Sequence, residues 1–207
     1  MDASELLRDA RVVPVIVLDD PGEAVRLADV LFGAGLRTIE VTLRTSSALE
    51  SIEKIAGILP DVVVGAGSVR TAHQFAQIKD AGAHFAVSPG SSALLLEAAT
   101  SHEMPFVPGA ATASEIIRLQ EHGYTLTKFF PAEIAGGIPM LKALGSPLPE
   151  ARFFPTGGIT PALAIDYLAQ SNVSCIGGSW ITPGDLLASR DYKAIAKIAV
   201  EAATLGG

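Results

Sequence analysis

Eight short apolar or β-branched runs recur along this chain of 207 residues, and their starts lie 21 to 26 residues apart. An interval of this length holds one strand, one helix and the turns between them. The sequence therefore predicts a chain that alternates strands with helices from one end to the other. The predicted strands are Val12–Leu18, Thr38–Leu43, Val62–Val69, His84–Pro89, Pro105–Gly109, Leu126–Pro131, Ala151–Thr156 and Ser174–Ser179.

Apolar residues at helical spacing lie between several of these runs. Three glycines, Gly35, Gly82 and Gly123, come just before a predicted strand, where a left-handed residue often ends a helix. The predicted helix faces are Ala24, Leu27, Ala28, Leu31 and Phe32 in the first case, Leu94, Leu95, Ala98 and Ala99 in the second, and Ile116, Ile117 and Leu119 in a third.

Strands that are apolar throughout and alternate with helices indicate a parallel sheet covered by helices. A count of eight strands favours a closed (β/α)8 TIM barrel over an open doubly wound sheet. The segment Ser4–Arg11 is predicted to form a short extra helix before the first strand. No linker or change of composition divides the chain, so we expect residues 1–207 to form a single barrel domain.

Charge and composition limit the classes of binding partner that this chain is expected to have. Hydrophobic residues make up 49% of the chain and charged residues 18%, which is typical of a compact folded protein. The net charge is −7 and no basic run occurs, so nucleic acid is not an expected partner. An anionic small molecule stays possible, because the potential inside a site depends on local groups.

The single cysteine, Cys175, cannot form an internal disulfide, and its apolar surroundings predict a small core residue. The first residues lack the basic and apolar regions of a signal peptide. No apolar run approaches the roughly 18 residues that a membrane span needs. We therefore expect no membrane association and a cytoplasmic location.

Lys128 lies inside the strand-like run Leu126–Pro131, where a lysine without a partner is rarely buried. Burial disfavours the charged form of an amine, and a neutral amine can form a Schiff base with a carbonyl substrate. The alternative is a lysine that extends its ammonium group to the strand end and pairs with a carboxylate. Local sequence does not choose between the two.

Other unusual residues lie at the predicted carboxyl ends of the strands, where TIM barrels hold their active sites. Glu40 lies in the second apolar strand, and Arg44 would share its face because side chains repeat every two residues. The two could take part in chemistry, or they could form a structural ion pair. The third, fourth and fifth strands end in Gly65–Ser68, Ser88–Gly90 and Val107–Gly109, which are turns or the wall of a tight mouth.

Paired glycines follow the seventh strand, at Gly157 and Gly158, and the eighth ends in Gly177-Gly178-Ser179. Glycine pairs allow backbone N–H groups to approach an anion, and barrels often bind phosphate after these two strands. Because both loops carry the same pattern, a phosphate site is favoured over simple turns.

The four histidines, His73, His84, His102 and His122, are scattered and show no metal-ligand spacing. The sequence therefore predicts no metal site. Without a metal site, any carbon–carbon (aldol) cleavage by this chain would need a lysine, in place of a metal ion, as its electron sink.

Taken together, these segments resemble the class I 2-keto-3-deoxy-6-phosphogluconate (KDPG) aldolase family, also called 4-hydroxy-2-oxoglutarate (KHG) aldolase. The resemblance extends over nearly the full chain in order. It rests on the runs Val12–Leu18, Leu36–Thr45, Val64–Val69, Val87–Gly90, Thr127–Glu133, Phe154–Thr160 and Cys175–Trp180.

The resemblance implies that Lys128 forms the Schiff base and that Glu40 is the general acid and base. Arg44 and Ser68 would bind the carboxylate of the pyruvate half, although many members have threonine where this chain has Ser68. Thr156 would lie beside the substrate hydroxyls and influence stereochemistry.

By the same resemblance, Gly157, Gly158, Gly178 and Ser179 would bind the substrate phosphate. The implied reaction is reversible, metal-independent cleavage of KDPG to pyruvate and glyceraldehyde 3-phosphate, without a cofactor. The family also implies possible cleavage of 4-hydroxy-2-oxoglutarate to pyruvate and glyoxylate, and a homotrimeric assembly.

Alternative functions fit parts of the pattern. A phosphosugar isomerase or epimerase, or a non-catalytic phosphate-ligand binding protein, could use the same glycine loops. An aldolase for the galactonate-derived epimer could use the same lysine and glutamate. Thr156 favours the gluconate-derived substrate by resemblance, and the glycine loops favour a phosphorylated one.

Overall fold

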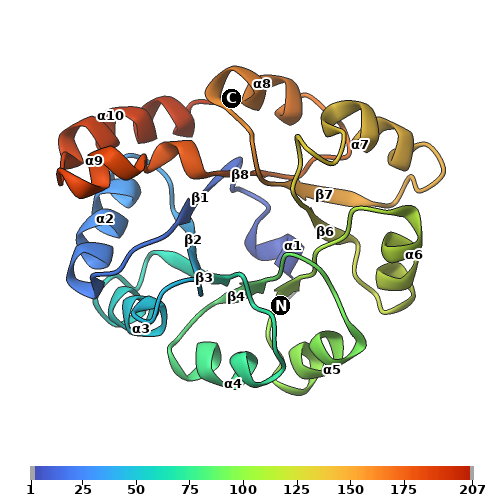
Figure 1. The fold of residues 1–207 in the computed structure, drawn as a ribbon, viewed down its shortest axis with the longest axis horizontal. Coiled ribbons are helices and arrows are strands. Elements are labelled where there is room, and N and C mark those ends of the chain that lie inside the picture. The colour runs from blue at the N-terminus through green and yellow to red at the C-terminus, as the bar shows by residue number, and fades with distance from the viewer. Residues whose placement is uncertain (1–2, 206–207) are drawn as a thin grey trace.

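The computed structural model describes residues 3–205 and alternates strands with helices along the chain (Figure 1). Each of the eight predicted runs contains one strand, and the strands are shorter because the runs also include loop residues. The strands are β1 (Val12–Ile16), β2 (Thr38–Thr42), β3 (Val63–Gly67), β4 (Phe85–Val87), β5 (Phe106–Val107), β6 (Leu126–Phe129), β7 (Arg152–Pro155) and β8 (Ile176–Gly178).

The strands pair in parallel. Six of them form one curled sheet in the order β5-β4-β3-β2-β1-β8, and β6 pairs with β7 (Figure 1). Isolated parallel bridges connect the two groups, since Gly109 pairs with Lys128 after β5 and Thr156 pairs with Gly177 beside β8. The predicted α/β class with a parallel sheet is confirmed.

The helices after the first surround the strands on the outside, whereas the short first helix lies near the centre of the view (Figure 1). Within residues 3–205, no helix combines the length and the apolar character that a membrane crossing requires. The helices are α1 (Ala3–Leu6), α2 (Pro21–Gly33), α3 (Ala48–Ile58), α4 (His73–Asp80), α5 (Ala93–Ser101), α6 (Ala113–Glu121), α7 (Gly137–Gly145), α8 (Pro161–Leu168), α9 (Gly184–Ala188) and α10 (Tyr192–Ala203), with a 3-10 turn, η1 (Ser179–Ile181), after β8.

The helix ends follow local chemistry. Gly35, Gly82 and Gly123 have φ values of 97°, 82° and 85°, so the predicted glycine stops of three helices are confirmed. At the start of α6, the Thr112 side chain accepts from the Glu115 backbone N–H, and the Glu115 carboxylate accepts from Thr112 in return. This reciprocal capping satisfies N–H groups that the helix itself cannot pair.

The predicted helix faces are correct for α2 and partly wrong for α5 and α6. Leu94 is 67% exposed, and the helix buries the predicted Leu95 together with Leu96, which lies outside the predicted face. Ile117 is 46% exposed, whereas Ile116 is buried. Neighbouring apolar residues leave the rotation of a short helix ambiguous in sequence, and packing against the sheet decides it.

The predicted helix at Ser4–Arg11 is in the right place but is too long. The structure has only α1, Ala3–Leu6, and the chain then turns to enter β1 at Val12. Ala3 and Leu7 are each 1% exposed, and they pack against side chains that the strands enclose.

Two apolar clusters stabilise the fold. The larger one lies between the strands and the outer helices. The smaller one is enclosed by the strands and includes Val13, Phe85, Leu126, Phe154 and Cys175. The prediction that Cys175 is a core residue is confirmed, and burial, followed by the Glu40 carboxylate, raises the pKa of its thiol.

Gly65 of β3 makes room for the Phe85 ring inside the strands. A Cβ at Gly65 would lie 2.2 Å from Phe85 Cζ, and Phe85 is fully buried. We therefore expect Gly65→Ala to lower the free energy of unfolding by about 1–3 kcal/mol through overpacking, measured by urea denaturation.

Gly57→Ala is the matched control, because Gly57 lies in α3 and a Cβ there meets nothing within 4 Å. Alanine loses less conformational entropy than glycine when a helix forms. Gly57→Ala should therefore raise the free energy of unfolding by about 0.5–1 kcal/mol. Equal stability of Gly65→Ala and the natural protein would contradict the close fit of Phe85.

Candidate active site

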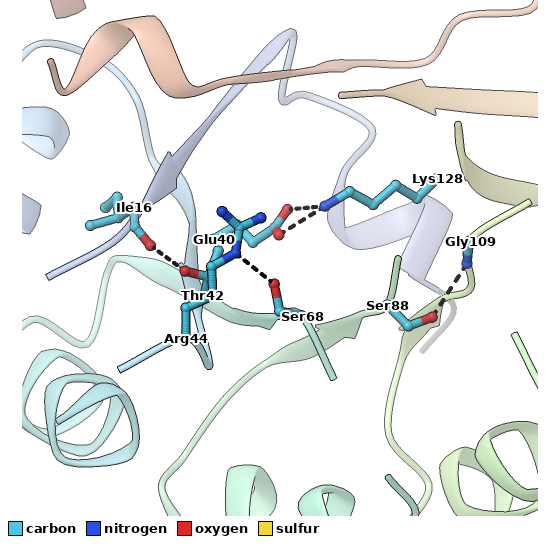
Figure 2. A network of polar contacts seen from close by, with 8 residues as sticks. All are labelled: Ile16, Glu40, Thr42, Arg44, Ser68, Ser88, Gly109 and Lys128. Carbon is cyan, nitrogen blue, oxygen red and sulfur yellow. Dashed lines mark hydrogen bonds and ion pairs between the residues drawn. The ribbon is translucent and has the colours of Figure 1, made fainter. Parts of the chain in front are cut away.

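Lys128 and Glu40 form a buried ion pair inside the strands (Figure 2). Lys128 Nζ lies 3.0 Å from Glu40 Oε1 and 3.3 Å from Oε2. The two residues are 5% and 0% exposed. The Lys128 ammonium group therefore does not extend to water, although it does pair with a carboxylate. That carboxylate is close enough to exchange a proton with the amine.

Gly67 of β3 provides the space that the Glu40 side chain occupies. A Cβ on Gly67 would lie 2.1 Å from Glu40 Oε1 and 2.6 Å from its Cγ. The neighbouring Thr42 donates a hydrogen bond to the Ile16 carbonyl at 3.0 Å, which ties β2 to β1 beside this position. The carboxylate is therefore held by strand geometry as well as by Lys128.

The backbone of Lys128 is bonded to the segment after β5. Lys128 N–H donates to the Pro108 carbonyl at 2.9 Å, and the Lys128 carbonyl accepts from Ala110 N–H at 2.9 Å. The buried Ser88 hydroxyl accepts from Gly109 N–H at 3.3 Å (Figure 2) and also donates to the Gly90 carbonyl. The glycine- and proline-rich strand ends therefore hold the strand of the lysine in position.

Arg44 and Ser68 lie beyond the ends of β2 and β3, where Arg44 Nε donates to Ser68 Oγ at 3.3 Å (Figure 2). Ser68 has a φ of 57°, a left-handed conformation that is uncommon for serine. The alternative of a structural Glu40–Arg44 ion pair is wrong, since the described ion-pair partner of Glu40 is Lys128. The exposed guanidinium of Arg44 can therefore receive an anion.

Thr156 follows β7 and is 5% exposed. Within the described part of the chain its hydroxyl has no hydrogen-bond partner. Gly177 on the neighbouring β8 leaves space for it, because a Cβ there would lie 2.3 Å from Thr156 Oγ1. A buried hydroxyl without a partner destabilises the protein unless a ligand satisfies it.

The predicted phosphate residues lie at the carboxyl ends of two neighbouring strands, β7 and β8. Gly157 and Gly158 follow β7 with φ values of 102° and 80°, and Gly178 ends β8 where the 3-10 turn of Ser179 begins. A Cβ on Gly158 would lie 2.8 Å from Glu133 Cβ, so the loop after β6 packs closely against this turn. Since parallel strands have their carboxyl ends at one edge, both glycine loops open on the same side as the Lys128–Glu40 pair.

Sequence reasoning missed two aromatic rings beside Lys128 and a side-chain contact beside the Gly157–Gly158 turn. Phe130 and Phe154 place their rings over Lys128 Nζ, with centroids at 5.6 and 5.8 Å. Tyr167 of α8 donates to Glu133 Oε1, and burial, followed by this hydrogen bond, raises the pKa of Tyr167. The predicted strand Leu126–Pro131 would have placed Phe130 on the face of Lys128, although β6 ends at Phe129. The contact with Phe154 requires the pairing of β6 with β7.

The histidines stay apart from this arrangement. Among residues 3–205, no three His, Cys, Asp or Glu side chains come together in a way that could hold a metal ion. The titratable pair of the candidate site is therefore Lys128 and Glu40, with Arg44 at its rim.

Comparison with known proteins agrees with this geometry. The chain matches the family model of KDPG and KHG aldolases over residues 3–198. It is 46% identical over 200 residues to the KHG/KDPG aldolase of Escherichia coli (strain K12), which covers 97% of this chain and 94% of that protein. It is 43% identical over 202 residues to the 2-dehydro-3-deoxy-phosphogluconate aldolase of Pseudoalteromonas atlantica, covering 98% and 94%.

Solved structures are similar over the same length. The KDPG aldolase of Legionella pneumophila, with pyruvate captured as a covalent carbinolamine intermediate, has a TM-score of 0.94 at 40% identity and 97% coverage of both chains. The Zymomonas mobilis ZM4 enzyme with 3-phosphoglycerate has a TM-score of 0.93 at 41% identity, covering 99% of this chain and 96% of that one. The resemblance predicted from sequence is confirmed, and the chain belongs to the KDPG and KHG aldolase family.

Proposed function

We propose that this chain reversibly cleaves 2-dehydro-3-deoxy-6-phosphogluconate to pyruvate and glyceraldehyde 3-phosphate through a Schiff base on Lys128. The observation that carries the proposal is the buried Lys128–Glu40 pair in a member of this family. Cleavage of 4-hydroxy-2-oxoglutarate to pyruvate and glyoxylate uses the same chemistry. Family membership does not favour the isomerase or epimerase alternative.

The amine must first lose a proton before it can attack. Glu40 is 3.0 Å from Nζ and accepts that proton, which leaves a neutral amine beside the substrate ketone. The amine adds to C2 to give a carbinolamine, which loses its hydroxyl group as water when Glu40 returns the proton. The product is an iminium, with its positive charge on Nζ.

The iminium then receives the electrons of the breaking C3–C4 bond. Glu40 removes the proton of the C4 hydroxyl, directly or through water, and the aldehyde leaves as an enamine forms on Lys128. Glu40 then returns the proton to C3, and water releases pyruvate. One carboxylate therefore serves as base and acid in turn, within contact of the nitrogen that changes charge.

Substrate binding completes the proposal. Arg44 and Ser68, already hydrogen-bonded to each other, bind the pyruvate carboxylate and orient the ketone toward Lys128. The unpartnered hydroxyl of Thr156 binds a substrate hydroxyl and influences stereochemical choice. The backbone of Gly157, Gly158 and Gly178, with the Ser179 hydroxyl, binds the phosphate. Binding at that distant end supplies energy away from the reacting carbon.

We also propose that residues 1–207 form one closed eight-stranded barrel with a short helix before β1. The isolated bridges at Gly109 and Thr156, which connect the six-stranded sheet to the β6–β7 pair on both sides, support closure. The homotrimer and the cytoplasmic location expected from the sequence stay predictions.

Borohydride reduction in the presence of pyruvate tests the Schiff base. We expect one pyruvate-derived adduct, located on Lys128 by peptide mass spectrometry, and loss of cleavage in Lys128→Ala. Lys142→Ala is the matched control, because Lys142 is an exposed lysine of α7, and it should keep full activity. An adduct on another lysine, or undiminished cleavage by Lys128→Ala, would reject the mechanism.

Glu40→Gln separates proton transfer from binding. Loss of the general acid and base should slow KDPG cleavage by about 10²–10⁴-fold, with a much smaller effect on pyruvate binding. Glu50→Gln is the control, since Glu50 forms an exposed ion pair with Lys54 at 2.8 Å. Steady-state kinetics and pyruvate titration measure the two effects, and normal turnover by Glu40→Gln would make Glu40 structural.

Thr156→Val should stabilise the free protein while it impairs the enzyme. Removing the unpartnered buried hydroxyl should raise the free energy of unfolding by about 1 kcal/mol, and cleavage of KDPG should fall because a substrate contact is lost. Thr42→Val should instead lower stability by about 1 kcal/mol, since its hydroxyl is bonded to Ile16. A destabilised but fully active Thr156→Val would contradict the assignment.

A further inference from the structure

The amine of Lys128 lies between two aromatic rings as well as beside a carboxylate. Its Nζ is 5.6 Å from the ring centroid of Phe130 and 5.8 Å from that of Phe154. Phe154 is fully buried on β7 and is the direct pairing partner of Lys128 on β6. Phe130 comes directly after the end of β6, two residues after Lys128, and its ring lies over the same amine.

The positions of both rings are constrained by their neighbours. Phe154 belongs to the apolar cluster that the strands enclose. The Phe130 ring lies against the turn after β7, where a Cβ on Gly157 would be 3.2 Å from Phe130 Cε2. Turning the Phe154 ring away from Nζ would disrupt the enclosed cluster, and turning the half-buried Phe130 ring would move it off the turn after β7.

The face of an aromatic ring carries negative electrostatic potential and attracts a cation within about 6 Å of its centre. In the proposed reaction, Nζ is positive as the ammonium and as the iminium, and it is neutral as the free amine, the carbinolamine and the enamine. Glu40 changes its own charge when it accepts and returns protons. The quadrupoles of the two rings stay constant through every step.

We propose that Phe130 and Phe154 form an aromatic clamp that stabilises the positive charge of the Lys128 iminium. The proposal rests on the Schiff-base function. When the carbinolamine hydroxyl leaves as water, taking a proton from Glu40, the nitrogen lone pair forms the C=N bond and positive charge appears on Nζ. The clamp favours that state over the neutral carbinolamine, and so raises the share of enzyme held as iminium.

Fluorinated phenylalanines test the clamp without changing the shape of the site. Each fluorine weakens the negative face of the ring and adds little volume. We would place 4-fluoro-, 3,5-difluoro- and 3,4,5-trifluorophenylalanine at position 154, and in a second series at position 130, of the full chain. The first readout is the initial rate of borohydride trapping at saturating pyruvate, where the enzyme is divided between carbinolamine and iminium and only the iminium is reduced. The others are the steady-state kcat with KDPG and urea unfolding as a check on folding.

We expect this trapping rate to fall with each added fluorine, by about 2- to 30-fold in total at each ring, which is the range of cation–π interactions. Phe129 is the matched control. It lies between Lys128 and Phe130, is fully buried, and packs against Phe153 at 6.2 Å in the outer cluster. The same fluorine series at Phe129 should leave trapping unchanged.

Two results would overturn the clamp: trapping that does not depend on fluorine number at Phe130 and Phe154, or an equal dependence at Phe129. Phe154→Tyr, which keeps the ring face, should retain trapping better than Phe154→Leu, which keeps only apolar packing. If the natural protein forms no pyruvate adduct, the Schiff-base function itself fails. If it forms the adduct and the fluorine series has no effect, only the clamp fails.

Discussion

The buried ion pair between Lys128 and Glu40 is the constraint on which the rest of the site depends. Two charges removed from water are tolerated only if each compensates the other, because an unpaired one would destabilise the fold strongly. The two residues are 88 positions apart in sequence, and only the curling of the sheet brings β2 and β6 face to face. The ion pair therefore forms only in the curled sheet, and the curled sheet can bury these two charges only as a pair.

The interior enclosed by the strands is divided along their length. One end is apolar and is filled by side chains such as Phe85 and Leu126, with Ala3 and Leu7 from the start of the chain packed against them. Toward the carboxyl ends, small residues replace large ones, and Gly67 leaves the space that the Glu40 carboxylate occupies. Close packing at one end holds the polar groups of the other in fixed positions.

Chemistry and binding are distributed over different elements of this arrangement. The strands carry Lys128 and Glu40, the groups proposed to change charge, and the loops carry the groups proposed to bind the carboxylate and phosphate ends of the substrate. The unpartnered hydroxyl of Thr156 and the rings beside Lys128 lie between these two regions. Family membership makes aldol chemistry the natural use of such a lysine, and the fixed ring faces suggest how its positive intermediate is favoured.

Sequence alone determined the order of strands and helices and the glycine stops such as Gly35, because these depend on local pattern. It also determined the family and pointed to Lys128 and Glu40, because these depend on motifs that occur in a fixed order along the chain. Only the tertiary structure decided the rest. It showed that Glu40 pairs with Lys128 and not with Arg44, that Leu94 faces outward, and that Phe154 lies beside the amine. These facts depend on strand pairing and helix rotation, which are set by packing between segments far apart in the chain.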